Sequence, residues 1–336
     1  MEEKRIGIII AACLLLGAGV LSAAPMREET RTFSLDEVES LVIAYRAGRV
    51  SFRESGGGEL ILTERLRDAE DAKVSAEGRM LRITGDERPW FPFSVRRIEA
   101  EIAIPRSYRG DLRAQTGSGS VYSDAHLISD GVIEIRVSSG AMNLRRLSAR
   151  EITLRSASGS IQADEISGSS EIVLSSGSLD IGKLSGERHR IRSSSGSVRI
   201  DEAEGSTDAE LSSGGLRFGS LKGERHRIRA SSGTIHAGEL GGAAEFTASS
   251  GGVRVDAARL SGDLSFDLRS GGLDLRLAGD TAFNLDAETS SGRIRVVSPE
   301  GEYSTSDRSS VVRPFGANPQ YTIYARVRSG YITIIR

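Results

Sequence analysis

The chain has little of several residues on which other classes of protein depend. Its 336 residues include a single cysteine, Cys13, so no disulfide or multi-thiolate metal site can form within one chain. Aromatic residues make up only 5% of the chain, which leaves few platforms for stacking. The formal net charge is -2, without a basic tail or block, and this argues against nucleic acid or an acidic membrane surface as a partner.

The segment 1–24 differs from all that follows. Lys4 and Arg5 precede an apolar run that extends from Ile6 to Ala24 and ends in small side chains. This is the pattern of a secretory signal, and the run is also long enough for an uncleaved membrane anchor. A lipoprotein-like cleavage box before Cys13 is a third alternative. We therefore expect an extracytoplasmic protein, in the periplasm, at the cell surface or secreted. It would touch the membrane only through residues 1–24, if these are retained.

A Ser-Gly marker recurs from Gly119 almost to the end of the chain. The positions of successive marker glycines differ by 21, 19, 18, 19, 18, 19, 18, 20 and 21, and the last difference of 38 is twice 19. A fixed period of this kind is typical of one structural unit stacked many times. The markers are Gly119, Gly140, Gly159, Gly177, Gly196, Gly214, Gly233, Gly251, Gly271, Gly292 and Gly330.

Apolar residues alternate on both sides of each marker. They lie five and three positions before the glycine and two and four positions after it, as Ile172, Leu174, Leu179 and Ile181 do around Gly177. Steps of two indicate strands with one buried face, and glycine suits the corner between them because it accepts positive φ. A third apolar position and often a second glycine complete the unit. We therefore predict an all-β fold, a parallel β-solenoid in the form of a right-handed β-helix, in which each rung contains one marker at a corner.

The regularity of the repeat divides the chain into five parts. We predict a signal peptide or membrane anchor at 1–24, an N-terminal cap with irregular rungs at 25–115, the regular solenoid at 116–298, a projecting loop at 299–320 and a terminal rung at 321–336. The loop is inferred from prolines that replace rung sequence. A cap is expected because the last rung of a solenoid otherwise leaves an open, aggregation-prone edge.

From about Glu99 the chain resembles the bacterial DUF4097 family of adhesin-like proteins. The resemblance is carried by the alternating strand Ile98–Pro105 and by the segment Leu-Arg-Ala-Gln-Thr-Gly-Ser-Gly-Ser-Val that begins at Leu112. The Ser-Ser-Gly units at Gly177, Gly196, Gly214, Gly233 and Gly251 continue it. The resemblance implies an extracytoplasmic β-solenoid of repeated strands, and it brings no catalytic residues with it.

The residues three positions after successive marker glycines form the most basic outward row. That row reads Asp180, Arg199, Arg217, His236, Arg254 and Asp274. Stacked rungs would bring these side chains into one column, and guanidinium groups bind carboxylates through charge-assisted hydrogen bonds. Arg199, Arg217, His236 and Arg254 are therefore the candidate ligand stripe, with an acidic glycan as its ligand. A solvated face that binds nothing is the alternative.

Two histidines raise the question of a metal site. His189 and His226 occupy the two copies of a duplicated Gly-Glu-Arg-His-Arg-Ile-Arg segment. Two rungs would separate them by ~9.6 Å, too far for one zinc ion with ligands at ~2.0–2.1 Å. We interpret them as duplicated rungs with charge pairing. The sequence also has no calcium-binding nonapeptide, phosphate loop or metalloprotease motif, so we expect no metal, cofactor or catalytic residues.

These features predict a non-enzymatic, extracytoplasmic adhesin or envelope scaffold, with an acidic glycan or another envelope protein as its partner. Two alternatives stay open. One is a polysaccharide-active β-helix enzyme, which would need a pair of carboxylates in a groove formed by the 299–320 loop. The other is a membrane-anchored accessory protein of the envelope stress response, which would keep residues 1–24.

Overall fold

The computed structural model describes residues 26–85, 97–257, 259–305 and 309–336. They divide into two compact units, one that ends at Gly168 and one that begins at Ser169. Every regular element among the described residues is a β-strand, and none of these residues belongs to a helix that could cross a membrane. The predicted signal or anchor at 1–24 lies outside the described residues. The all-β prediction is confirmed, and each unit is a stack of parallel rungs.

The first unit contains rungs that pair in parallel and in exact register. Strand β2 (Ser40–Ser55) pairs with β7 (Asp111–Ile128), β7 pairs with β8 (Val132–Ser139), and β8 pairs with β9 (Met142–Ser158). Marker residues face each other at every step. Gly48 pairs with Gly119, and Ser118 with Ser139. The period of the repeat therefore sets the strand register as well as the strand spacing.

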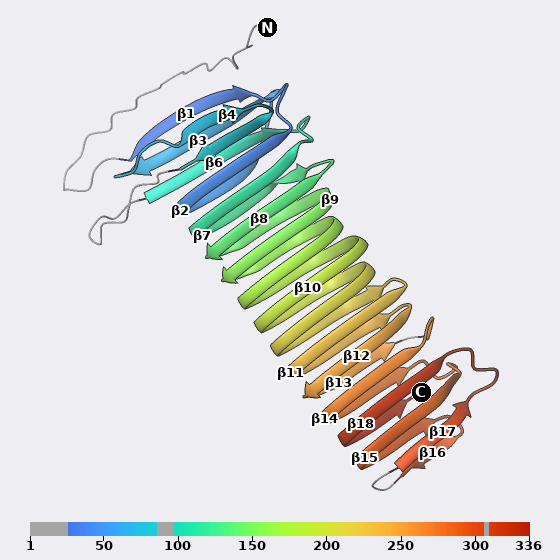
Figure 1. Cartoon of the computed structure of the whole chain (residues 1–336). Coiled ribbons are helices and arrows are strands. Elements are labelled where there is room, and N and C mark those ends of the chain that lie inside the picture. The colour runs from blue at the N-terminus through green and yellow to red at the C-terminus, as the bar shows by residue number, and fades with distance from the viewer. Residues whose placement is uncertain (1–25, 86–96, 258, 306–308) are drawn as a thin grey trace. The chain divides into compact units, whose positions relative to one another are not determined.

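The N-terminal end of this unit is covered by additional strands (Figure 1). On the edge of β2 away from β7 lie β5 (Met80–Thr84) and β6 (Arg97–Pro105), which together form an outer rung. Antiparallel strands then cover this rung. β3 (Glu59–Arg67) pairs with β6, β1 (Arg27–Ser34) pairs with β3, and β4 (Lys73–Glu77) pairs with β5. The change from parallel to antiparallel pairing ends the stack.

A buried carboxylate organises this cap. The side chain of Glu64 in β3 is 1% exposed and ion-paired with Arg31, and it accepts hydrogen bonds from the Tyr45 hydroxyl at 2.9 Å and the Ala72 amide at 3.0 Å. Burial and the Glu64 charge raise the pKa of Tyr45 well above its usual range. In the sequence, the charged stretch from Glu64 to Lys73 indicates a turn or irregular excursion. The structure instead places Glu64 inside a strand, because its partners satisfy the charge that would otherwise oppose burial.

The second unit is also a stack of parallel rungs. It comprises β10 (Ile161–Lys222) from Ser169 onward, β11 (Arg225–Leu240), β12 (Ala243–Ser250), β13 (Val253–Ala257), β14 (Leu264–Leu277), β15 (Phe283–Ser298) and β18 (Thr322–Ile335). β10 is not one straight strand, because its corner glycines Gly177, Gly196 and Gly214 turn it into successive rungs. The predicted inward residues Ile172, Leu174, Leu179 and Ile181 are all at most 1% exposed. Side chains of equivalent rows stack on one another, as Phe246 and Phe266 do with ring centroids 5.1 Å apart.

The order of rungs at the C-terminal end differs from the order in the sequence. β18 pairs on one edge with β14 and on the other with β15, so Gly330 lies between Gly271 and Gly292 (Figure 1). The predicted terminal rung is therefore a rung, but it is inserted before the one that precedes it in the chain. The long gap before Gly330 is not a missing rung. It holds the connection that carries the chain past β15 and back.

The segment predicted as a projecting loop at 299–320 belongs instead to a cap. β16 (Gly301–Ser304) and β17 (Ser309–Phe315) both pair antiparallel with β15. Phe315 at the end of β17 stacks on Phe283 of β15, with ring centroids 5.2 Å apart. Proline did not prevent strand formation here, because Pro314 lies near the end of β17, where a missing backbone donor is tolerated. Both units thus end in antiparallel strands.

The corners of the rungs require glycine. The marker glycines have φ between +115° and +157°, a region that residues with a Cβ rarely adopt. Marker glycines of neighbouring rungs also lie directly against each other, so a Cβ at Gly214 would overlap the carbonyl oxygen of Gly196 in the rung before it. Gly215, one residue further on, has open space around it, with the nearest atom of another residue 3.8 Å from a Cβ built there. The requirement is therefore specific to one position in each corner.

We expect Gly214→Ala to lower the free energy of unfolding by about 2–4 kcal/mol, because it combines a strained φ with a backbone overlap. Gly215→Ala is the matched control, and its effect should stay within about 0.5 kcal/mol. Urea denaturation followed by circular dichroism measures both. Equal stability of the two variants would contradict the close approach of successive corners.

Candidate functional site

The four residues of the predicted stripe are brought together in one column of the second unit. Arg217 of β10 pairs in register with His236 of β11, which pairs with Arg254 of β13. Arg199 occupies the same position in the rung before Arg217, since the corner glycines of those two rungs, Gly196 and Gly214, lie against each other. The arginines are exposed, and His236 is half-buried.

The members of the column differ in how far their charges are already satisfied. Arg199 donates from Nε to Asp201 at 2.9 Å, and His236 Nε2 lies 3.0 Å from Asp256. Arg217 and Arg254 form no ion pair with any described residue. Asp274, the register partner of Arg254, follows the stripe in the column and accepts a hydrogen bond from the Tyr331 hydroxyl at 3.2 Å. The part of the stripe open to a ligand is therefore centred on Arg217 and Arg254.

Small residues border this part of the stripe. Gly215 and Gly219 lie two positions before and after Arg217 on the same outward face, and Gly252 lies two before Arg254. A Cβ at Gly215 or Gly252 would meet no atom closer than 3.7 Å. The guanidinium groups therefore stand on an open surface and not in a pocket. Such a surface suits a polymer lying across several rungs better than a small molecule.

The duplicated histidines face the core and not the surface. Both are fully buried; His189 Nε2 lies 2.9 Å from the carbonyl oxygen of Glu204, and His226 Nε2 lies 2.9 Å from that of Gly241. Burial lowers the pKa of both imidazoles. Thr207 is the register partner of His226 and separates the two histidines in the stack. Our interpretation of paired surface charges is therefore wrong for the imidazoles, which are buried polar members of the core.

No group of three or more His, Cys, Asp or Glu side chains in the described residues is arranged to hold a metal ion. The histidines have carbonyl partners instead of the carboxylate and imidazole neighbours that a metal would need. His189 also shares a hydrogen bond at 3.0 Å with Ser170, through Nδ1.

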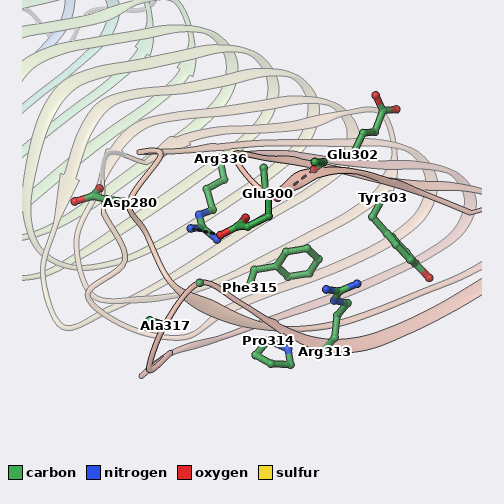
Figure 2. A pocket seen from close by; sticks show the side chains of 12 residues that line it. Asp280, Glu300, Glu302, Tyr303, Arg313, Pro314, Phe315, Ala317 and Arg336 are labelled. Atoms are coloured by element: carbon green, nitrogen blue, oxygen red, sulfur yellow. Dashed lines mark hydrogen bonds and ion pairs between the residues drawn. The ribbon is translucent and has the colours of Figure 1, made fainter.

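The cap of the second unit borders an open cavity of about 740 Å³ that sequence analysis missed. Figure 2 shows Arg336 beside Glu300, with the Phe315 ring and Arg313 further along the wall. The residues that line it are Asp280, Ser298, Glu300, Gly301, Glu302, Tyr303, Arg313, Pro314, Phe315, Gly316, Ala317 and Arg336. The prolines distinguished the segment 299–320 from the rungs, but no periodic pattern in the sequence predicted that charged side chains of the cap would lie together.

The carboxylates of this cavity bear on the alternative of a polysaccharide-cleaving enzyme. Hydrogen bonds from Ser298 and a backbone amide, together with Arg336, lower the pKa of Glu300. A hydrogen bond from Arg295 and its charge lower the pKa of Glu302. A general acid in glycoside hydrolysis needs the opposite, a carboxyl with a raised pKa that stays protonated. These two glutamates are held ionised and paired, which suits binding and not proton donation.

A family model described as Toastrack DUF4097 matches the chain twice, over residues 38–219 and 205–335. The chain belongs to the DUF4097 family. The two matches together span residues 38–335, which include the described rungs of both units but not strand β1 of the N-terminal cap. The resemblance inferred from the Ser-Gly units is therefore confirmed.

Solved structures similar to this DUF4097 chain come from several bacteria. Two are described as a "putative adhesin". The one from Parabacteroides distasonis is 10% identical, with 74% of this chain and 96% of that chain covered and a TM-score of 0.43. The one from Parabacteroides merdae is also 10% identical, with 74% of this chain and 95% of that chain covered and a TM-score of 0.39. A third, described as a "putative lipid binding protein" from Parabacteroides distasonis, has 13% identity, 92% and 97% covered and a TM-score of 0.33. No curated protein matches the chain.

The buried histidines predict a pH dependence of stability. The fold keeps both imidazoles neutral, whereas in the unfolded chain they titrate near pH ~6.5. Below that pH the unfolded state binds protons that the folded state does not, so stability should fall as the pH drops from about 6.5. Above it, the histidines should contribute no pH dependence.

We expect His226→Thr, which places the residue of the intervening rung at this position, to reduce the loss of stability between about pH 6.5 and about pH 5.5. Urea midpoints across this range measure the effect. His126→Gln, at an exposed histidine, should keep the wild-type slope. If His226→Thr kept that slope as well, the buried imidazole would not be the titrating group.

Proposed function

We propose that this DUF4097 protein is a non-enzymatic, extracytoplasmic binding protein of adhesin-like function, and that it holds acidic glycans along the stripe Arg199, Arg217, His236 and Arg254. The observation that carries the proposal is the column itself. Arg217, His236 and Arg254 stand on consecutive rungs in exact register, and the two arginines have no ion-pair partner among the described residues.

The spacing of the rungs suits a repeating anion. Neighbouring parallel strands lie ~4.8 Å apart, so the column presents a guanidinium or imidazole group at each such step. A polysaccharide with a carboxylate on each sugar could meet several of them at once. Each exposed ion pair contributes only ~0–1 kcal/mol, so useful affinity requires several contacts made by one chain. The open glycine borders at Gly215 and Gly252 leave room for such a polymer to approach.

The enzyme alternative receives less support from the chemistry of the side chains. The cavity beside residues 299–319 does contain carboxylates, as that alternative requires. The lowered pKa values of Glu300 and Glu302, however, make both unsuited to the proton donation that glycoside cleavage uses. Binding without turnover is therefore the better account of this end of the molecule.

The extracytoplasmic location in the proposal rests on the sequence pattern of residues 1–24. A charged start, an apolar run and small residues at its end are typical of exported proteins. A chain whose single cysteine lies inside that segment has no thiol beyond it to oxidise outside the cytoplasm. Its stability comes from the stacked core instead.

The stripe is tested by replacing its two unpaired arginines. Arg217→Ser with Arg254→Ser should weaken binding to polygalacturonate by about tenfold, because each loses a charge-assisted contact. Retention on an immobilised polygalacturonate column and calorimetric titration measure the change. Binding by the wild type should also weaken as salt is added, since exposed charges are screened.

The matched control is Arg188→Ser with Arg225→Ser. These arginines are exposed, belong to the same unit and change the net charge equally, but they lie outside the stripe. Their replacement should leave retention near the wild-type level. Equal losses in the two double variants would reduce the effect to net charge, and an unretained wild type would refute the proposed function.

A further inference from the structure

We propose that the cavity in the cap of the second unit is a separate binding site for a single carboxylate-bearing sugar, such as a hexuronic acid. It is separate from the stripe, because no residue of the stripe lines it. Its walls come from β15, β16 and β17, from the connections beside these strands, and from Arg336, which follows β18. Its volume of about 740 Å³ is within the range usual for pockets that bind small molecules.

The strongest indication is a buried guanidinium with an unused donor. The Arg336 side chain is only 7% exposed, and it lines the cavity. Its Nε donates to the carbonyl oxygen of Gly279 at 3.2 Å, and its Nη2 donates to Glu300 at 3.1 Å. Nη1 is buried and has no hydrogen-bond acceptor among the described residues. Since an unsatisfied buried donor is costly, a ligand oxygen that reached Nη1 through a small movement of this side chain would stabilise the site.

A second guanidinium lies in the same wall. Arg313 stands over the rings of Phe315, at 4.9 Å, and Tyr303, at 5.6 Å, and it forms no ion pair with a described residue. The rings hold this guanidinium in place without using its hydrogen-bond donors. Two arginines with unused donors in one cavity match a carboxylate, which can accept several charge-assisted hydrogen bonds. The cavity therefore has a preference for one anionic group.

The remaining polar groups limit how many charges the ligand can carry. Asp280 is paired with Arg259, and Glu302 with Arg295, through arginines that do not line the cavity. Glu300 is paired with Arg336. These carboxylates would repel a polyanion but accept hydrogen bonds from neutral hydroxyl groups. A ligand with one carboxylate and several hydroxyls satisfies both conditions, which is the chemistry of an acidic sugar.

Calorimetric titration of the purified protein with D-glucuronate and D-galacturonate tests the site. At least one should bind. D-glucose and acetate should each bind at least tenfold more weakly, since glucose lacks the carboxylate and acetate lacks the hydroxyl groups. Arg313→Gln and Arg336→Met should each reduce the affinity at least tenfold. Arg328→Gln, at an exposed arginine of β18 outside the cavity, should leave it unchanged.

Thermal melts show whether the variants fold, and if Arg336→Met does not, Arg313→Gln alone decides. Failure of both uronates to bind, or undiminished binding by Arg313→Gln, would overturn the proposal. The double variant Arg217→Ser with Arg254→Ser should keep uronate binding, so the outcome here is separable from that for the stripe. In that double variant, a trigalacturonate that binds as tightly as the monosaccharide would identify chain ends as the source of the ligand, and weaker binding would identify the free sugar.

Discussion

Both units depend on the contact between successive corner glycines. Within each unit, corner glycines with positive φ lie so close to the carbonyl oxygen of the corner glycine in the neighbouring rung that a Cβ would overlap it. This contact fixes the register of one rung on the next, and a register error of one residue would turn the apolar rows outward. The burial of each inward row, and with it most of the hydrophobic stabilisation, follows from that single alignment.

The same alignment turns positions in the sequence into columns on the surface. Residues three positions after successive corner glycines form the basic stripe. The serines just before the corner glycines form a second column, in which the Oγ atoms of Ser176 and Ser195 lie 3.4 Å apart. A repeat of this kind distributes binding groups evenly, whereas a concave site needs an interruption. In the second unit the interruption is the cap, where β16 and β17 turn antiparallel and gather side chains that no column would bring together.

The repeat was therefore the most predictable part of the molecule. Alternation around Gly177 correctly identified the inward residues, and the period predicted the stripe as a column. The period of the repeat predicts the length of a rung and its inward positions, but not which rungs are neighbours in the stack. The insertion of β18 between β14 and β15 therefore could not be predicted from it. The cavity was equally hidden, because Arg336 and Phe315 lie in different strands and share no spacing. The burial of His189 and Glu64 depends on partners distant in the sequence, which local patterns do not reveal.

The stacking order at the C-terminal end tests this account most directly, since it requires the glycine contacts to run from Gly271 to Gly330 to Gly292. In a Cys13→Ser background, Ser270→Cys with Ser329→Cys would join register partners whose Cα atoms lie ~4.8 Å apart, within the range that a disulfide spans. Ser270→Cys with Ser291→Cys would join residues two rungs apart, at ~9.6 Å. Mass spectrometry after mild oxidation should find a crosslink in the first variant and none in the second. The reverse result would show that the rungs stack in sequence order and would contradict the account.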